Sequence, residues 1–293
     1  MRPILLLACA ALALGACKSA SFTAPAAAPA ATGPVGPAAP TAPADDNLNA
    51  VLWVQTAVEY RALSEQAYRA AADRLDQALK ERNWDALVPE ERANAATGLK
   101  PAVVLDVDET VLDNSPYQAR LIRDGKSYDD ATWDLWVAEK KAKAVPGVVD
   151  FAKAATAKGV TLVYISNRAV HLKEATLANL RAVGLPVAGD DVFLGLGTVV
   201  EGCTQPKASE KNCRRQLAGR KYRVLMQFGD QLGDFVQVKD NSAAGHAALY
   251  DEYADWFGER WFMLPNPTYG AWETRYRGEA RRQAKRDALD VAE

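Results

Sequence analysis

The chain has 293 residues, 35 Lys and Arg against 37 Asp and Glu, and 49% hydrophobic residues. This length and apolar content are enough for one large domain or two small ones with a buried core, and they exclude a wholly disordered chain. A formal net charge of -2 gives no positive field for a nucleic acid polymer. Because the chain has two histidines, a multi-histidine zinc site is excluded, and carboxylates have to supply any acid, base or metal chemistry.

Residues 1–17 have the pattern of an export signal. Arg2 precedes an apolar run too short to span a bilayer permanently, and the segment ends in Leu-Gly-Ala-Cys at Cys17. This ending resembles a bacterial lipobox, which implies cleavage before Cys17 and a lipid anchor on that residue. Lys18 follows, and by resemblance to known sorting rules it favours the bacterial outer membrane. The alternative is an ordinary secretory signal with an incidental cysteine.

Residues 18–46 are rich in Ala and Pro and nearly lack large apolar side chains, so we expect a disordered tether there and a folded domain over residues 47–293. Of the four cysteines, one is removed with the signal and Cys17 carries the lipid. Cys203 and Cys213 remain in an oxidising compartment, where we expect a disulfide between them. Two free or buried thiols are the alternative.

The folded region reads as an alternation of helices and strands. Apolar residues recur every three or four positions from Leu52 to Leu79, which predicts one long amphipathic helix. Continuous apolar runs predict strands buried on both faces, and helical patterns lie between them: strands at 102–105, 161–165 and 222–228, a shorter run at 191–194, and helices at 147–158 and 171–183. This alternation predicts an α/β fold with a parallel sheet and right-handed crossovers.

Polar residues follow each of the three main apolar runs. Asp106-Val107-Asp108-Glu109-Thr110 follows the first, Ser166-Asn167-Arg168 the second, and Gly229-Asp230-Gln231-Leu232-Gly233-Asp234 the third. Because ligands bind beyond the carboxyl ends of parallel strands, we expect these side chains to meet at one edge of the sheet. A group of three or four carboxylates is costly unless a cation neutralises it, and all-oxygen ligation favours Mg²⁺.

An Asp-x-Asp pair directly after a strand can divide two chemical tasks. Asp106 can approach a phosphorus atom while Asp108 reaches the leaving oxygen, which makes a covalent aspartyl-phosphate route feasible. Phosphoryl transfer also needs a cation beyond the metal and several hydrogen-bond donors. Ser166 offers a hydroxyl, and lysines at 207 and 211 could supply the ammonium.

The strings VVLDVDETVLDNSPY, VYISNR, ASEKNCRR and FGDQLGDF resemble, in order and spacing, the four motifs of the haloacid dehalogenase superfamily. With the lipobox and the strings WVQTAVEY, AVPGVVDF and LPNPTYGAWE, the chain looks like the class C acid phosphatases, the lipoprotein 5'-nucleotidase group. The resemblance covers nearly all of residues 48–274. It implies a Rossmann-like haloacid dehalogenase core, a small helical cap inserted at about 115–146, and flanking N- and C-terminal helices.

The resemblance also implies roles for the carboxylates. Asp106 is the nucleophile, and Asp108 is the general acid that later activates water. Mg²⁺ is held by Asp106, the backbone carbonyl of Asp108, and Asp230. Asp234 is expected to orient the metal ligands or to bind the metal indirectly, and a cap on the following turn is the alternative.

The remaining motif residues are expected to bind the phosphoryl group. By the same resemblance, Ser166 contacts the phosphoryl oxygens and Asn167 belongs to the substrate site. Lys211 matches the family's Ser-x-Lys-x-x-Arg pattern with Ser209 and Arg214, and Lys207 is the alternative.

Two aromatic residues match positions that sandwich an aromatic base in the family. They are Trp133 in the inserted segment and Tyr269 near the C-terminus. Stacking on a base contributes roughly 1 to 3 kcal/mol. Without the resemblance both side chains are read as packing residues, and Trp136 is expected to fill the core of the helical cap.

The sequence thus predicts a lipid-anchored, Mg²⁺-dependent acid phosphatase that hydrolyses nucleoside 5'-monophosphates or nicotinamide mononucleotide outside the cytoplasm. One alternative is a broad phosphomonoesterase or phosphotransferase, which differs in the substrate groups that can bind between Trp133 and Tyr269. Another is a non-catalytic nucleotide-binding surface lipoprotein. A homodimer, the commonest soluble oligomer, is compatible with all three.

Overall fold

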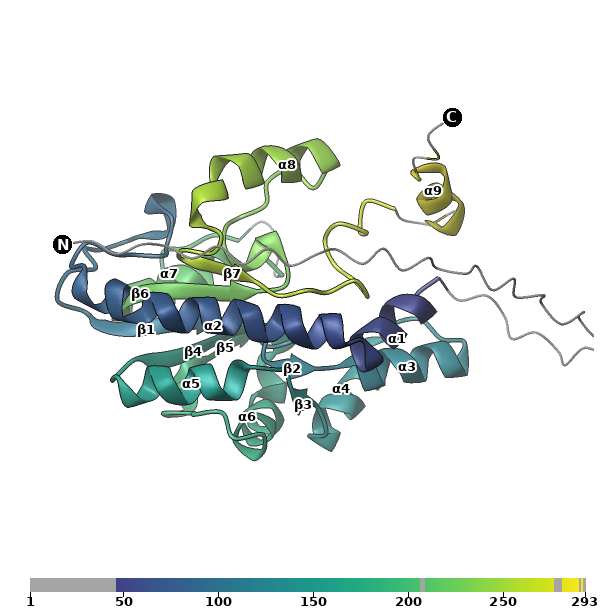
Figure 1. The fold of residues 1–293 in the computed structure, drawn as a ribbon, viewed down its shortest axis with the longest axis horizontal. Helices are drawn as coiled ribbons and strands as arrows, with labels where there is room; N and C mark the ends of the chain where they lie inside the picture. The colour runs from purple at the N-terminus through teal and green to yellow at the C-terminus, as the bar shows by residue number, and fades with distance from the viewer. Residues whose placement is uncertain (1–45, 206–208, 277–280, 290, 292–293) are drawn as a thin grey trace, which may run out of the picture. The chain divides into compact units, whose positions relative to one another are not determined.

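The computed structural model describes residues 46–205, 209–276, 281–289 and 291; the predicted signal peptide with Cys17, and the tether up to residue 45, lie outside them. Within these ranges the main sheet is parallel throughout and has the strand order β5-β4-β1-β6-β7 (Figure 1). Its strands are β1 (Lys100–Leu105), β4 (Thr161–Ala169), β5 (Phe193–Leu196), β6 (Tyr222–Gly229) and β7 (Trp261–Met263). The predicted α/β fold is therefore confirmed.

The central position of β1 determines where the site forms. Leu105, its last residue, is in register with Tyr164 of β4 on one side and Phe228 of β6 on the other. The chain therefore leaves β1 and β6 at the same height, with Asp106 next to the residues that follow β6. The backbone N–H of Asp106 still donates to the carbonyl of Phe228 at 2.9 Å, so its main chain is fixed by the sheet.

Alternate side chains of the strands enter two separate cores. Val103 and Leu105 face the core formed with helices α2, α5 and α6, whereas Ala102 and Val104 face the core on the side of α7. The helices have these bounds: α2 Val58–Lys80, α5 Val148–Ala157, α6 Lys173–Ala182 and α7 Asn212–Lys221. Both faces of the sheet are covered, which explains the continuous apolar runs in the sequence.

The predicted single helix from Leu52 to Leu79 is wrong at its beginning. The structure has two helices, α1 (Leu48–Thr56) and α2, separated by Ala57 in extended backbone conformation. Leu52, Val58 and Leu63 are exposed. The buried face of α2 repeats at three- and four-residue spacing through Tyr60, Ser64, Tyr68, Ala71, Leu75 and Ala78. The break allows α1 to contact α3 of the inserted segment instead of continuing along the sheet.

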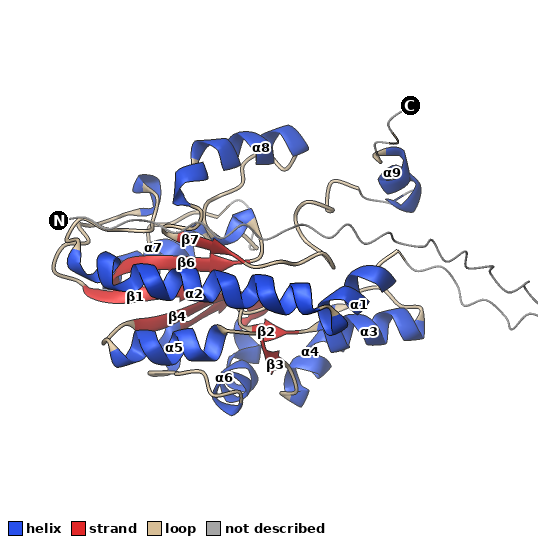
Figure 2. Cartoon of the chain, viewed as in Figure 1, coloured by secondary structure: helices blue, strands red, loops and turns tan. Residues whose placement is uncertain are grey.

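The inserted segment forms a small helical unit beyond the carboxyl ends of the strands (Figure 2). It contains the helices α3 (Ser115–Asp124) and α4 (Asp130–Glu139) and the strand β3 (Lys143–Ala144), which pairs antiparallel with β2 (Leu112–Asp113) just before the insertion. Trp136 is 3% exposed and packs in this unit as predicted.

The remaining helices are short. They are α8 (Ala243–Glu252), α9 (Arg281–Asp287) and the 3-10 turns η1 (Pro89–Glu91), η2 (Val170–Leu172), η3 (Asp190–Val192), η4 (Leu232–Asp234) and η5 (Ala254–Trp256). In the part of the chain that the structure describes, no helix combines the length and apolarity needed to cross a bilayer.

Candidate active site

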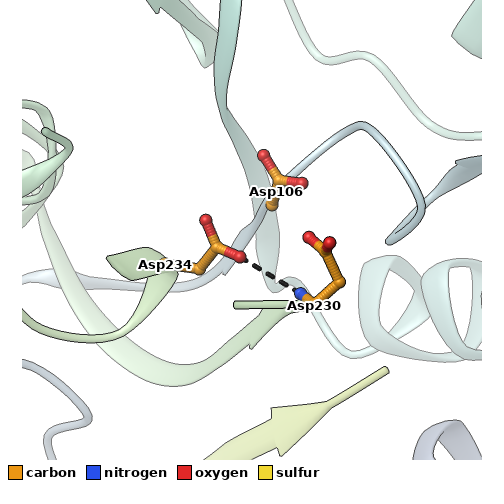
Figure 3. Close-up of side chains that lie close together, drawn as sticks. All are labelled: Asp106, Asp230 and Asp234. Atoms are coloured by element: carbon orange, nitrogen blue, oxygen red, sulfur yellow. Dashed lines mark hydrogen bonds between the residues drawn. The ribbon is translucent and has the colours of Figure 1, made fainter. Parts of the chain in front are cut away.

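Three carboxylates converge at the carboxyl edge of the sheet. Asp106 follows β1, Asp230 follows β6 and Asp234 ends η4, and one oxygen from each lies within 4.8 Å of the others. Figure 3 shows the three side chains close together, with a dashed line for the hydrogen bond from the backbone N–H of Asp230 to Asp234. Asp106 and Asp234 are buried, whereas Asp230 is half-buried. Such an arrangement suits a hard divalent cation, which prefers carboxylate oxygens.

The loop after β6 is shaped around Asp234. Oδ2 of Asp234 accepts hydrogen bonds from the backbone N–H groups of Asp230 (3.1 Å) and Gln231 (3.0 Å). Gln231 is the N-cap residue of η4. A Cβ on Gly229 would lie 2.3 Å from the Cβ of Asp234, so only glycine permits this close approach. Asp234 therefore caps the start of η4, the turn in which it lies, rather than the turn that follows it, and it also belongs to the carboxylate cluster.

Lys211 is the cation among these carboxylates. Its Nζ donates to Oδ1 of Asp106 and, at 2.6 Å, to Oδ1 of Asp234, and the side chain is buried. Lys211 directly precedes α7, whose packing on the sheet fixes its position. Lys207, the alternative in the sequence, lies outside the described residues.

Removal from water dominates the electrostatics of the cluster. Desolvation raises the pKa of Asp106 to about 7, although Lys211 acts to lower it. Desolvation, followed by the charges of Asp234 and Asp106, also raises the pKa of Asp230 well above its ordinary value. For Lys211, desolvation acts to lower the pKa, but the charges of Asp106 and Asp234 outweigh it and raise that pKa. One ammonium thus leaves an excess of negative charge that a metal ion would neutralise.

Asp108 lies beside the cluster, with its two oxygens in different surroundings. Oδ1 accepts from Arg168 and, at 2.9 Å, from Nδ2 of Asn114. Among Ser166, Arg168 and Asn114, only Ser166 contacts Oδ2, through a long hydrogen bond of 3.4 Å from its hydroxyl. The Ser166 hydroxyl also accepts from the backbone N–H of Arg168 at 2.9 Å.

A cavity of about 930 Å³ opens above the cluster. Its walls include most of the predicted site residues: Asp106, Asp108, Trp133, Asn167, Lys211, Asp230, Asp234 and Tyr269. Ser166 is the exception, because its side chain is fully buried behind Asp108. Arg214, from the lysine motif, donates to the carbonyl of Ser166 at 2.5 Å and to Oδ1 of Asn167 at 2.8 Å, which fixes the end of β4.

The two predicted aromatic residues approach this cavity from different parts of the chain. Trp133 lies in α4 and packs edge-on against Tyr117, with ring centroids 5.2 Å apart. Tyr269 lies in the segment after β7, and its hydroxyl donates to Oε2 of Glu109. The structure therefore brings both rings to one cavity, and Tyr269 reaches the loop that follows β1.

Glu109 contacts the predicted site residue Tyr269, but the sequence predicts no role for it. It is 3% exposed and has a left-handed backbone conformation (φ 58°), which is uncommon for a residue other than glycine. Its Oε1 accepts from the backbone N–H of Asn114 at 2.8 Å. Desolvation, followed by the charges of Asp108 and Asp230, raises the pKa of Glu109 well above its ordinary value. The only sequence signal was its place in the Asp-Val-Asp-Glu-Thr string.

The structure contains a disulfide between Cys203 and Cys213, whose Cα atoms are 5.7 Å apart. Cys213 is buried in the first turn of α7, two residues after Lys211. The bridge therefore joins the segment that leads to Lys211 to the helix that follows it.

Comparisons with known proteins agree with this geometry. Residues 11–272 match the family described as HAD superfamily, subfamily IIIB (acid phosphatase). The solved structure of the class C acid phosphatase from Bacillus anthracis is similar, with a TM-score of 0.72 and 35% identity over 84% of this chain and 98% of that chain. The structure of that enzyme with tungstate bound matches with the same values. The chain therefore belongs to the class C acid phosphatases of HAD subfamily IIIB, and it is a phosphoric monoester hydrolase.

Proposed function

We propose that this acid phosphatase is a Mg²⁺-dependent enzyme that hydrolyses nucleoside 5'-monophosphates, or nicotinamide mononucleotide, through a phosphoaspartate at Asp106. The observation that carries the proposal is the single cavity in which a cluster of carboxylates with one lysine lies below two aromatic side chains, Trp133 and Tyr269. The tungstate bound by the Bacillus anthracis enzyme supports an oxyanion site, because tungstate is an oxyanion like phosphate.

The donor set fits Mg²⁺. Asp106 and Asp230 offer carboxylate oxygens, the backbone carbonyl of Asp108 would be the third protein ligand, and Asp234 orients the loop that carries Asp230. Bound there, the cation supplies charge neutralisation for the substrate phosphate and for the ionised nucleophile. The raised pKa values of Asp106 and Asp230 support this assignment, since the site holds more negative charge than Lys211 can balance.

The chain's own residues divide the reaction into two steps. A carboxylate oxygen of Asp106 attacks phosphorus, the bond to the ester oxygen breaks, and that oxygen takes a proton from Asp108. In the second step water attacks phosphorus while Asp108 takes a proton from it. The bond between phosphorus and Asp106 then breaks and inorganic phosphate leaves. Lys211 stabilises the ionised form of Asp106 and the transferring oxygens.

Substrate binding requires one rearrangement near Asp108. For Ser166 to contact a phosphoryl oxygen, its hydroxyl has to exchange Asp108 for the substrate, and the bond to Asp108 is long enough to be readily lost. Asn167 is exposed at the cavity wall and is positioned by Arg214 to contact the same group. The base lies between Trp133 and Tyr269.

The location that we propose for the enzyme rests on the sequence alone. The lipobox ending at Cys17 supports a lipid anchor at the bacterial outer membrane. Cys17→Ser should move the protein from the membrane fraction to the soluble fraction and remove labelling by radioactive palmitate. Unchanged labelling would contradict the anchor.

The function is tested by phosphate release from AMP, nicotinamide mononucleotide, p-nitrophenyl phosphate and glycerol 2-phosphate, with and without Mg²⁺. We expect metal-dependent turnover that favours the two nucleotides, and no turnover by Asp106→Asn. Acid quenching with ³²P-labelled substrate should trap label on the wild-type protein and none on Asp106→Asn. Equal turnover of all four substrates would contradict the nucleotide preference, and unlabelled wild-type protein would contradict the phosphoaspartate.

A further inference from the structure

Arg168 is a buried cation that contacts both Asp108 and Trp133 of the proposed site. It lies at the end of β4 with 1% of its surface exposed. Its Nε and Nη2 both reach Oδ1 of Asp108, at 2.9 and 2.8 Å. Burying a guanidinium without a partner costs free energy, and the ion pair with Asp108 offsets that cost.

The contacts of Arg168 leave the two oxygens of Asp108 unequal. Nη2 also donates to Oδ1 of Asn114 (3.2 Å), and Nη1 donates to the hydroxyl of Thr176 (3.4 Å). Asn114 in turn donates to Oδ1 of Asp108, so this oxygen accepts from three donor atoms. Oδ2 accepts only from the Ser166 hydroxyl among these residues. Oδ1 is therefore anchored by three donor atoms, and Oδ2, with one long contact among these residues, is the oxygen available to a bound substrate.

The same guanidinium lies over an aromatic ring of the cavity wall. Its central carbon is 5.4 Å from the ring centroid of Trp133, within the range of a cation–π interaction. Trp133 itself lines the cavity and packs against Tyr117 on another side. Arg168 thus contacts both the carboxylate next to the reacting group and the ring predicted to bind the base.

We propose that Arg168 is a positioning residue that anchors Oδ1 of Asp108, so that Oδ2 faces the leaving oxygen, and that also holds the Trp133 ring in the cavity wall. This inference rests on the proposed role of Asp108 as general acid. By acting through both residues, Arg168 couples proton transfer to recognition of the leaving group. Lysine cannot replace it fully, because an ammonium lacks the planar fork that reaches one carboxylate oxygen through two nitrogens.

The test compares kcat/KM, which reports transfer to Asp106, for three substrates. p-Nitrophenolate leaves without a proton, glycerol needs one, and AMP needs one and adds a base. General acid catalysis contributes on the order of 10²- to 10⁴-fold. For Arg168→Met we therefore expect glycerol 2-phosphate to lose at least tenfold more kcat/KM than p-nitrophenyl phosphate, and AMP to lose more than glycerol 2-phosphate. Two ratios of kcat/KM express these differences: glycerol 2-phosphate to p-nitrophenyl phosphate, and AMP to glycerol 2-phosphate. Arg168→Lys should lower both ratios, but by less than Arg168→Met.

Two further variants separate the interpretations. Arg223→Met removes another buried arginine, whose donors reach backbone carbonyls at the end of α2, and should lower thermal stability without changing either ratio. Equal losses of all three substrates in Arg168→Met and Arg168→Lys would overturn the inference and leave a purely structural arginine. Asp108→Asn should show the same leaving-group dependence as Arg168→Met. If Asp108→Asn lacks it, the proposed acid role is wrong, which is a different result from a failure of Arg168 alone.

Discussion

Asn266 donates a hydrogen bond from Nδ2 to Oδ2 of Asp230 at 2.7 Å. Its Oδ1 accepts from the backbone N–H of Thr268 at 2.9 Å. Because a backbone N–H can only donate, this second bond fixes which end of the amide faces Asp230. The segment after β7 therefore orients a carboxylate that follows β6, and the proposed metal site includes a contact from a residue outside the four motifs.

We expect Asn266→Ala to weaken Mg²⁺ binding about 10- to 100-fold, the usual cost of losing a residue that orients a metal ligand. Isothermal titration calorimetry with Mg²⁺ measures this directly. Asn94→Ala serves as the matched control, since Asn94 is exposed and its amide reaches the carbonyl of Arg220, which lies outside the cavity wall. Equal affinities in the two variants would show that Asn266 does not orient Asp230.

The aromatic pair makes a separate prediction about substrate choice. Trp133→Ala and Tyr269→Ala should each raise KM for AMP by roughly 5- to 150-fold, from a stacking contribution of about 1 to 3 kcal/mol, and change KM for glycerol 2-phosphate little. Steady-state kinetics on both substrates measure the difference. Tyr269→Phe keeps the ring but loses the bond to Glu109, so an intermediate effect is expected. A similar rise for glycerol 2-phosphate would mean that the rings only support the fold.

The sequence predicted the part of the site that depends on adjacent elements. Apolar runs buried on both faces mark β1, β4 and β6, and polar residues directly after them have to lie at one edge of a parallel sheet. Asp106, Asp230 and Asp234 meet for that reason. β7 was missed because three residues, Trp261–Met263, are too short to show a period.

Two other features depend on contacts between residues far apart in sequence. A single arginine at the end of a strand is usually exposed, and nothing local to Arg168 indicates that Asp108 and Asn114 surround it. The break at Ala57 has neither proline nor glycine to mark it, and it is explained by the contact of α1 with α3. Both are tertiary effects that local periodicity does not contain.

The ion pair between Arg120 and Glu139 joins α3 to α4 and predicts how the stability of the protein depends on pH. Hydrogen bonds from Arg120 (2.6 Å) and then from Lys141 lower the pKa of Glu139 from 4.5 to about 2. A lowered folded-state pKa stabilises the protein above the unfolded value and loses that effect as pH falls toward 2. Glu139→Gln should therefore lower the melting temperature slightly at pH 6, and by less with each step from pH 4.5 toward 2. A difference that stays constant with pH would contradict the pairing.

The disulfide makes the last prediction, because it spans the segment that leads to Lys211. Closing a loop between Cys203 and Cys213, ten residues apart, stabilises the fold by about 2 to 3 kcal/mol through the entropy of the unfolded chain. Cys203→Ser should lower the melting temperature. It should also lower kcat, since Lys211 immediately precedes the helix turn that holds Cys213 and contacts both Asp106 and Asp234.

Dithiothreitol should reproduce both effects in the wild-type protein and have no further effect on Cys203→Ser, which controls for other actions of the reductant. Melting temperature and kcat are measured on the same reduced samples, with thiol titration to verify that the bridge is open. A lower melting temperature with unchanged kcat would mean that the bridge stabilises the fold without positioning Lys211. The packing of α7 on the sheet would then be enough to hold the lysine between its two carboxylates.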